Sequence, residues 1–163
     1  MRKAAKRPAG RTRRATKTSA RRPLRMAAKR KAPRPRAKKQ TFVASHLDPD
    51  AFEGGLRSYA KYRDLGIAAA TGGRARAHVI KMLPPCDPEV VSKRHYHDVE
   101  FQMIYVLKGW IKGEYDGAGV VIMREGSCWL QPPKIKHSVL DYSDDCELLE
   151  IILPADFATT ELE

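Results

Sequence analysis

The sequence predicts an all-β fold, a sandwich or a barrel, preceded by a disordered basic arm. In the second half of the chain, short apolar or alternating segments follow one another at near-even spacing, and glycine, proline or aspartate turns separate them. The chain also lacks a convincing amphipathic helix and an internal repeat. Its 163 residues favour one domain with some chain left over.

The first 40 residues differ sharply in composition from the rest. They hold 18 of the 31 Lys and Arg residues and no Asp or Glu, whereas residues 41–163 carry 13 basic and 19 acidic side chains, a net charge of −6. With four prolines and almost no large apolar residue, this segment cannot bury enough surface to offset its ordering entropy. We expect a disordered arm at 1–40 and a single domain at 41–163.

Three interpretations of the arm stay open. The first is a polycation without a specific role, the second a tether that contacts nucleic acid or another polyanion non-specifically, and the third an organelle transit peptide. A transit peptide also needs an apolar helical face, which this segment lacks, and no aromatic residue is present to stack on bases. No stretch is apolar enough to span a membrane, so no membrane contact is expected.

The three cysteines are Cys86, Cys128 and Cys146, and they form no CxxC pair. Three thiols cannot all pair within one chain, which fits a reducing compartment. We interpret them as small core residues. The expected location is cytoplasmic, with organelle targeting through the arm as the alternative.

The expected elements of the domain follow from local patterns. A short helix is expected around residues 49–52, Gly72 and Gly73 mark a turn, and strands are expected over 75–82, 101–108, 110–115, 120–126 and 127–133. The "DGAG" segment at 116–119 predicts a hairpin turn. Segments 137–145 and 146–154 predict a final strand pair around a Ser-Asp-Asp turn.

Two histidines precede the apolar strand at 101–108. Residues two apart on a strand face the same side, so His95 and His97 lie with their Cα atoms roughly 6.6 Å apart. Two imidazoles at this spacing can share one metal ion, or the strand can simply expose both to solvent. His137, which begins another strand after a proline turn, is the candidate third ligand.

A fourth ligand is less certain from the pattern. Gln102 can supply an amide oxygen, and Glu100 is the competing oxygen donor. Both stand an odd number of positions from the histidines, so a bulge or loop at Asp98 and Val99 is required.

These residues resemble the two motifs of the cupin family. His95, His97, the position of Gln102 and Gly109 match the first motif, and Gly126, Pro132 and His137 match the second. The resemblance covers about residues 65–155. It implies a small antiparallel jelly-roll barrel, often dimeric, that holds a divalent metal through three histidines and one acidic residue.

The sequence departs from the family pattern at three positions. Gln102 stands where the family has its Glu ligand, and Lys134 and Asp141 replace a Gly and an Asn of the second motif. A neutral amide leaves the full +2 charge of the metal uncompensated, so the site should bind metal more weakly and polarise a bound oxygen more strongly. Because an amide does not titrate, proton transfer would fall to Glu100, to metal-bound hydroxide or to the substrate.

The resemblance implies a metal-dependent enzyme for a small organic molecule, dioxygenase-like or a lyase or isomerase. Iron, manganese, nickel, copper or zinc would serve as the metal. Met103, Tyr105 and Trp129 are candidate pocket residues, and a homodimer is expected. The alternative is a non-catalytic ligand-binding or regulatory module that the basic arm tethers to nucleic acid.

Overall fold

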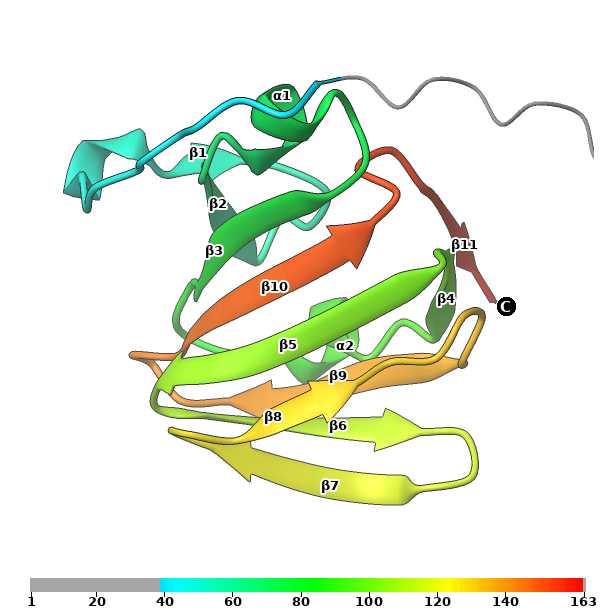
Figure 1. Ribbon diagram of the computed structural model, residues 1–163. Helices are drawn as coiled ribbons and strands as arrows, with labels where there is room; N and C mark the ends of the chain where they lie inside the picture. The colour runs from blue at the N-terminus through cyan, green and yellow to red at the C-terminus, as the bar shows by residue number, and fades with distance from the viewer. Residues whose placement is uncertain (1–38, 163) are drawn as a thin grey trace, which may run out of the picture. The chain divides into compact units, whose positions relative to one another are not determined.

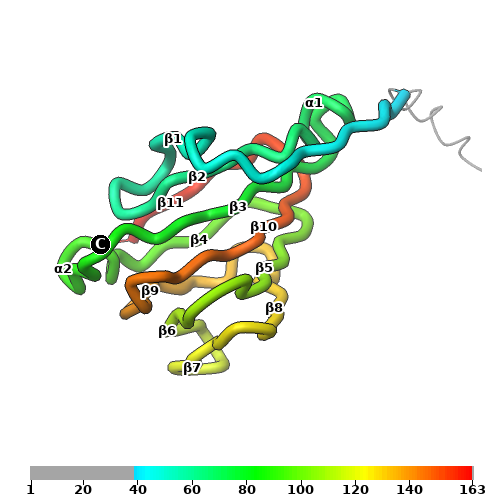
Figure 2. The backbone as a smooth tube through the Cα atoms, turned by 90° about the vertical axis from the view of Figure 1, so that its left-hand side faces the viewer, coloured from blue at the N-terminus to red at the C-terminus, as the bar shows by residue number. Residues whose placement is uncertain are grey.

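The computed structural model describes residues 39–162, which form two antiparallel β-sheets packed face to face (Figures 1 and 2). One sheet has six strands in the order β1-β2-β3-β10-β5-β8, and the other has five in the order β11-β4-β9-β6-β7. This arrangement confirms the predicted antiparallel jelly-roll barrel. The interpretations of the basic arm concern residues that lie, except for its last two, outside the described part.

Eleven strands and three short helical segments make up the domain. The strands are β1 (Glu53–Gly54), β2 (Ala60–Asp64), β3 (Arg76–Met82), β4 (His95–Asp98), β5 (Phe101–Lys108), β6 (Trp110–Tyr115), β7 (Gly119–Arg124), β8 (Cys128–Leu130), β9 (His137–Tyr142), β10 (Glu147–Leu153) and β11 (Ala158–Glu161). The helical segments are the 3₁₀ helix η1 (Pro49–Ala51), α1 (Ile67–Thr71) and α2 (Pro88–Val91).

Alternation along the strands places the core between the two sheets. In β5, Gln102, Ile104 and Val106 are buried while their neighbours are partly or fully exposed, as a period of two requires. The apolar core combines residues from both sheets: Ala60, Met82, Val91, Ile104, Val106, Ile111, Tyr115, Met123, Tyr142, Cys146 and Leu148. The polar Gln102 is thus buried on the same face of β5 as the core residues.

Most of the expected elements are present. The structure confirms the short helix near residue 50, the strands over 75–82, 101–108 and 110–115, and the hairpin turn at 116–119, where Tyr115 pairs with Gly119. Three short elements were not expected: α1, α2 and β11. Each has only four or five residues, too few for a periodic pattern to identify it.

The predicted final strand pair is wrong. Segments 137–142 and 147–153 are strands, but β9 pairs with β4 and β6, whereas β10 pairs with β3 and β5 in the other sheet. The chain turns at Ser143 and crosses between the sheets, and Cys146 donates its N–H to the Ser143 carbonyl across this turn at 3.0 Å. Both strands have an apolar inner face, so their pattern fits a hairpin within one sheet as well as a crossing between two sheets.

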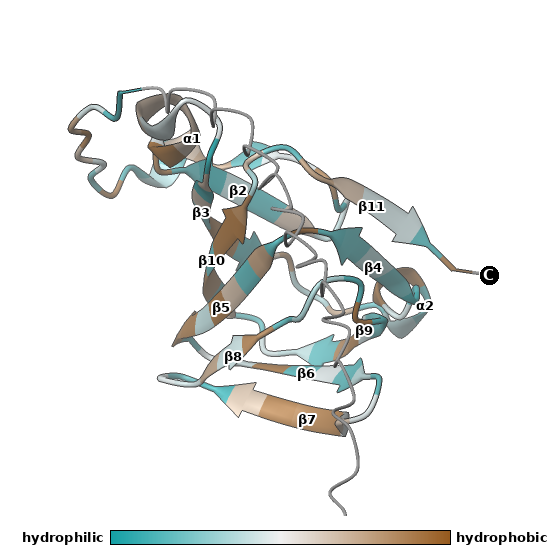
Figure 3. Ribbon diagram, turned by 45° about the vertical axis from the view of Figure 1, so that its right-hand side comes forward, coloured by the Kyte–Doolittle hydropathy of each residue, from teal (hydrophilic) through white to brown (hydrophobic). Residues whose placement is uncertain are grey.

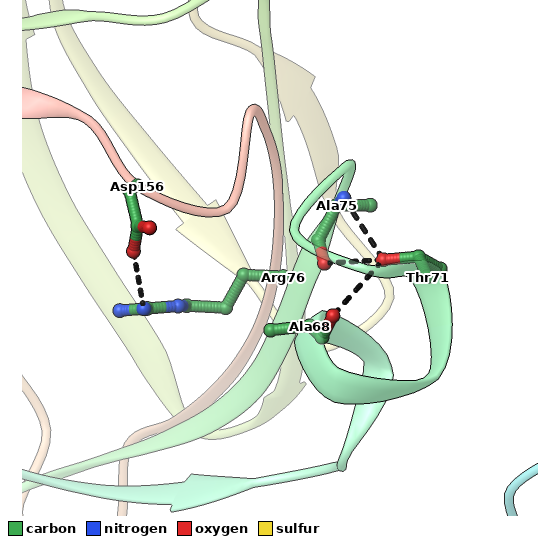
Figure 4. A network of polar contacts seen from close by, with 5 residues as sticks. All are labelled: Ala68, Thr71, Ala75, Arg76 and Asp156. Carbon is green, nitrogen blue, oxygen red and sulfur yellow. Dashed lines mark hydrogen bonds and ion pairs between the residues drawn. The ribbon is translucent and has the colours of Figure 1, made fainter. Parts of the chain in front are cut away.

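The start of β3 is fixed by a polar network after α1 (Figure 4). The Thr71 hydroxyl oxygen accepts from the Ala75 N–H at 3.2 Å, which closes the turn through Gly72 and Gly73, and the hydroxyl donates to its nearest carbonyl, that of Ile67, at 2.8 Å. One residue later, Arg76 Nη2 donates to Asp156 Oδ1 at 3.3 Å. These contacts connect the first residue of β3 to the segment that follows β10.

Exposed apolar side chains gather on β7, an edge strand (Figure 3). Val120, Val121 and Ile122 are all exposed, and Figure 3 shows β7 as a largely hydrophobic ribbon. Among residues 39–162, no helix is long and apolar enough to cross a bilayer.

The environments of the three cysteines differ. Cys146 is fully buried in the core, Cys86 is half-buried, and Cys128 is exposed on β8, so the interpretation of Cys128 as a core residue is wrong. Trp129 faces the cavity, so alternation along β8 places its neighbour Cys128 on the outer face. Burial raises the pKa of the Cys146 thiol to about 12.

We predict selective alkylation of these thiols. Iodoacetamide at pH 8 should modify Cys128 rapidly and leave Cys146 unmodified in the folded protein, because the thiolate is the nucleophile and Cys146 is both inaccessible and protonated. Mass spectrometry of peptides after brief labelling measures this order. In urea, Cys146 should react as fast as Cys128, and equal labelling without urea would contradict the burial described here.

Gly109 makes the tight connection between β5 and β6. Its φ of +70° lies in the left-handed region, and an added Cβ would meet Ser143 Oγ and lie 2.6 Å from Asp145 Oδ1. Gly117 in the next hairpin also has a positive φ, of +81°, but an added Cβ would meet nothing within 4 Å. These two glycines therefore separate backbone strain from steric overlap.

Gly109→Ala should destabilise the protein more than Gly117→Ala. The backbone cost of a left-handed Ala is about 1–2 kcal/mol and applies to both, whereas only the first substitution forces apart the turn that holds Ser143. Urea unfolding of both variants gives the free energies of unfolding. Equal losses would show that the turn at Ser143 accommodates the methyl group.

Candidate metal centre

Three buried imidazoles converge between the two sheets. His95 and His97 lie on β4 and point inward, while His137 opens β9 directly opposite His95 in the register of the two strands. They are 4, 7 and 5% exposed, and one ring nitrogen of each lies within 4.8 Å of the others. The structure brings together the three histidines that the sequence singled out.

The outer nitrogen of each ring is held by a hydrogen bond. Nδ1 of His95 contacts the Lys93 carbonyl at 2.8 Å, and Nδ1 of His137 contacts the Ile135 carbonyl at 2.9 Å. A carbonyl only accepts, so both Nδ1 atoms carry the proton and both Nε2 atoms carry a lone pair. His97 Nδ1 contacts Thr159 Oγ1 at 2.8 Å. The tautomers therefore suit metal coordination through Nε2.

Burial keeps the imidazoles neutral. Desolvation lowers the pKa of His95 to about 3 and that of His97 to about 4, and it also lowers the pKa of His137. The Arg57 cation adds to this effect at all three rings. At neutral pH the three nitrogens are thus available as ligands without prior loss of a proton.

Gln102 reaches the interior because the chain changes sheets. β4 ends at Asp98 and β5 begins at Phe101 in the other sheet, so the required interruption at Asp98 and Val99 is present. It shifts the alternation by one residue, which turns the Gln102 side chain inward. Glu100, within the same interruption, is exposed.

Gln102 belongs to a directed chain of hydrogen bonds. Trp129 Nε1 donates to Gln131 Oε1 at 3.1 Å, Gln131 Nε2 donates to Gln102 Oε1 at 3.0 Å, and Gln102 Nε2 donates to Glu150 Oε1 at 2.6 Å. The indole is a donor only, so it fixes the orientation of both amides. The chain ends at Glu150, whose other oxygen contacts His78 Nε2 at 2.5 Å.

Glu150 is the carboxylate nearest to this network. Burial alone would raise the pKa of its carboxyl group, but the hydrogen bonds and charge of His78 and the hydrogen bond from Gln102 outweigh it, so the pKa is lowered. The Glu150 side chain is 12% exposed and faces His78 across β3 and β10. An anionic group therefore contacts the Gln102 amide nitrogen directly.

The donor set fits a divalent transition metal. Three neutral Nε2 atoms converge, and Gln102 Oε1 keeps a second lone pair while it accepts from Gln131. Gln131 Nε2 also lies 3.2 Å from His137 Nε2, so a metal bound to that nitrogen would replace this hydrogen bond. Tyr115 stacks on the His137 ring at 5.8 Å and covers its outer face.

The histidines line a cavity of about 510 Å³ between the sheets. Gln102 and Trp129 also line it, whereas Glu100, Met103 and Tyr105 are not among its lining residues. Several polar residues that line the cavity were not predicted as site residues from the sequence: Arg57, His78, Tyr115, Gln131 and Glu150. Alternation in β10 places Glu150 on the same face as the buried Leu148 and Ile152, which was the one available signal.

Residues 86–152 match the family model described as "Cupin domain". Residues 86–152 are a cupin domain. This segment holds all three histidines, Gln102 and Glu150. No curated protein matches this chain in sequence.

Solved structures of cupin-type proteins share the fold of the described domain. KdgF from Halomonas sp. has 17% identity and a TM-score of 0.53, with 68% of this chain and 94% of that chain covered. The polyketide cyclase RemF from Streptomyces resistomycificus has 15% identity and a TM-score of 0.56, with coverage of 74 and 87%. Oxalate decarboxylase from Bacillus subtilis has 16% identity and a TM-score of 0.54. The match covers 76% of this chain but only 34% of the decarboxylase chain.

We predict that Gln102→Glu destabilises the protein and that Glu150→Gln rescues it. The single substitution sets two carboxylates at the 2.6 Å contact now made by Gln102 Nε2 and Glu150 Oε1, and it should cost on the order of 2 kcal/mol or more. In the double variant the contact reverses, because an amide at 150 donates to a carboxylate at 102.

Urea unfolding of the metal-free wild type, both single variants and the double variant gives the coupling energy between the two positions. Gln131→Glu is the matched control, since it places a carboxylate elsewhere in the same hydrogen-bond chain. Additive losses at positions 102 and 150 would contradict the proposed contact.

Proposed function

We propose that this cupin is a metal-dependent enzyme that acts on a small organic molecule. The observation that carries the proposal is the convergence of three neutral imidazoles, His95, His97 and His137, on one wall of a cavity large enough for such a molecule. Ligand cavities of roughly 300–1,000 Å³ are typical of small-molecule sites. The metal is iron, manganese, nickel, copper or zinc, all of which accept imidazole ligands.

Each polar group near the centre has a proposed role. The histidines hold the metal, and Gln102 is a weaker fourth ligand through its amide oxygen. Glu150 on β10 accepts from the amide nitrogen of Gln102, and Gln131 donates to its oxygen, so the oxygen points away from β10. When bound, the metal supplies a Lewis acid that polarises a substrate oxygen or bound water.

The charge distribution differs from that of a site with a ligating carboxylate. Gln102 leaves the metal charge uncompensated in direct contact, while Glu150 supplies a negative charge behind the amide. A centre of this kind favours substrates with an anionic or strongly polarised oxygen. It supports oxygenase, lyase or isomerase chemistry, and related folds include a polyketide cyclase, an oxalate decarboxylase and DMSP lyases.

The Glu100 carboxylate stays a weaker candidate for proton transfer. It is exposed and does not line the cavity, so it would need a movement of the segment between β4 and β5 to reach a substrate. Met103 and Tyr105 do not line the cavity either, so a substrate bound inside it would not contact them. Trp129 lines the cavity and is the proposed aromatic contact.

A homodimer also stays a prediction. The described surface that such a dimer would bury is the exposed apolar strand β7, with Val120, Val121 and Ile122. Edge strands with exposed apolar side chains readily pair with another chain.

The alternative function is a non-catalytic ligand-binding module tethered to nucleic acid by residues 1–40. Deletion of this segment separates the two functions. Turnover should survive the deletion in an enzyme, whereas a tether should lose its salt-sensitive retention on DNA.

Metal binding tests the proposal directly. The purified wild type should hold one divalent ion per chain. His97→Ala should lower the metal affinity by more than about 100-fold, because losing a ligand costs more than the roughly 10–100-fold loss that follows when a hydrogen-bond partner of a ligand is removed. Thr159→Val, which removes the hydroxyl beside His97 Nδ1, should show that smaller effect.

Metal content by mass spectrometry and affinity by competition with a chelator provide the measurements. His46→Ala is the matched control, since His46 is exposed and lies outside the cavity lining. Near-zero occupancy in the wild type, equal to that of His97→Ala, would remove the proposed metal centre.

A further inference from the structure

Arg57 brings a cation into the same cavity as the three histidines. It stands between β1 and β2, lines the cavity, and its side chain is 12% exposed. Nη1 donates to Glu161 Oε1 at 2.6 Å, which links this segment to β11. Segment 55–59 lies outside the region that matches the cupin family, so the family pattern does not account for this cation.

The second terminal nitrogen of Arg57 has no acceptor among the described residues. Nη2 is buried, yet no hydrogen-bond partner lies within reach in the described part of the chain. A buried donor left unpaired costs about 1–3 kcal/mol, and more when it is charged. Because Arg57 lines the cavity and one of its terminal nitrogens has no acceptor among the described residues, its guanidinium is suited to bind an anion there.

The position of Arg57 relates this nitrogen to the metal centre. Arg57 and the three histidines His95, His97 and His137 line the same cavity. Glu150 also lines the cavity, but its carboxylate is already paired with His78 and Gln102. A ligand in this cavity therefore meets a cation, Arg57, whose second terminal nitrogen has no hydrogen-bond partner in the described part of the chain.

The chemistry of the cavity selects the kind of anion. Glu161 already offsets part of the Arg57 charge, and a single free nitrogen suits a monoanionic carboxylate better than a dianionic phosphate. The remaining walls include the apolar side chains of Ile80, Met82, Ile104, Ile111, Val139 and Leu148. These walls fit a small organic body.

We propose that Arg57 binds a carboxylate of the small organic molecule on which the metal centre acts. This inference rests on the proposed function for the role of the metal, but the anion site itself does not require the metal. It narrows the substrate class to small organic acids. The substrate would lie with its carboxylate toward Arg57 and its reacting oxygen toward the histidines.

Two pairs of probes test the anion site: butyrate against butyramide, and benzoate against benzamide. Each pair keeps its shape and differs by one negative charge. The full-length protein, loaded with Zn²⁺ or treated with a chelator, is titrated by calorimetry. The wild type should bind at least one carboxylate about 10–100-fold more tightly than its amide, as a hydrogen bond to a charged group provides.

Arg57→Met should abolish this preference and leave the zinc content unchanged. Arg76→Met is the matched control, because Arg76 also lines the cavity but is already paired with Asp156, and it should keep the preference. Glu161→Gln keeps an oxygen acceptor for Nη1 but removes its negative charge, so it should keep or strengthen carboxylate binding.

The outcomes separate this inference from the proposed function. Absence of a carboxylate preference in the wild type, a preference that survives Arg57→Met, or tighter binding of inorganic phosphate than of either carboxylate would overturn the assignment. Equal loss of thermal stability in Arg57→Met and Glu161→Gln, with no change in binding, would make Arg57 only a structural link to β11. Failure of the metal centre shows independently as near-zero zinc content.

Discussion

The candidate site depends on one constraint, the outward direction of the Nδ1 atom in each of three imidazoles. Each of His95, His97 and His137 uses this nitrogen for a hydrogen bond to β-structure or its flanking segment, so Nε2 can face only the interior. Burial then removes the charge from the rings. A cluster of three neutral rings with inward lone pairs has little structural reason to exist, since no described donor except Gln131 meets these nitrogens. A cation is the partner that suits all three at once.

The network behind Gln102 shows how the barrel accommodates an amide where the family has a carboxylate. Trp129 cannot accept, so it fixes Gln131, which in turn fixes Gln102. The opposite end meets the ionised Glu150, which a ligating glutamate at position 102 would repel. The amide at position 102 and the carboxylate at position 150 therefore belong together. The negative charge lies on Glu150 of β10, whereas in the family pattern it lies at position 102.

The local patterns of the sequence were sufficient for the cluster of three histidines but not for the rest of the cavity. His95 and His97 are two apart, and their shared face follows from strand geometry alone. The His78–Glu150 contact joins residues 72 positions apart across β3 and β10, and nothing local signals that pairing. The error at β9 and β10 has the same origin, because adjacent strands that cross between sheets look like a hairpin. Lys134, with φ of 61°, occupies the motif position where the family has Gly, so the proline turn keeps its backbone despite the substitution.

The region that matches the family and the segments around it contribute different parts of the site. Residues 86–152 supply the three histidines, Gln102 and Glu150, whereas Arg57 and its partner Glu161 come from before and after that region. A barrel of this kind can keep its metal centre while the flanking segments change the charge at the other end of the cavity. The pair that joins the β1–β2 segment to β11 holds the guanidinium in place and leaves one nitrogen for a ligand. If Arg57 binds the substrate as proposed, substrate choice resides in the flanking segments, outside the cupin motifs, because the only cation in the described cavity lining that has a buried nitrogen without a partner lies there.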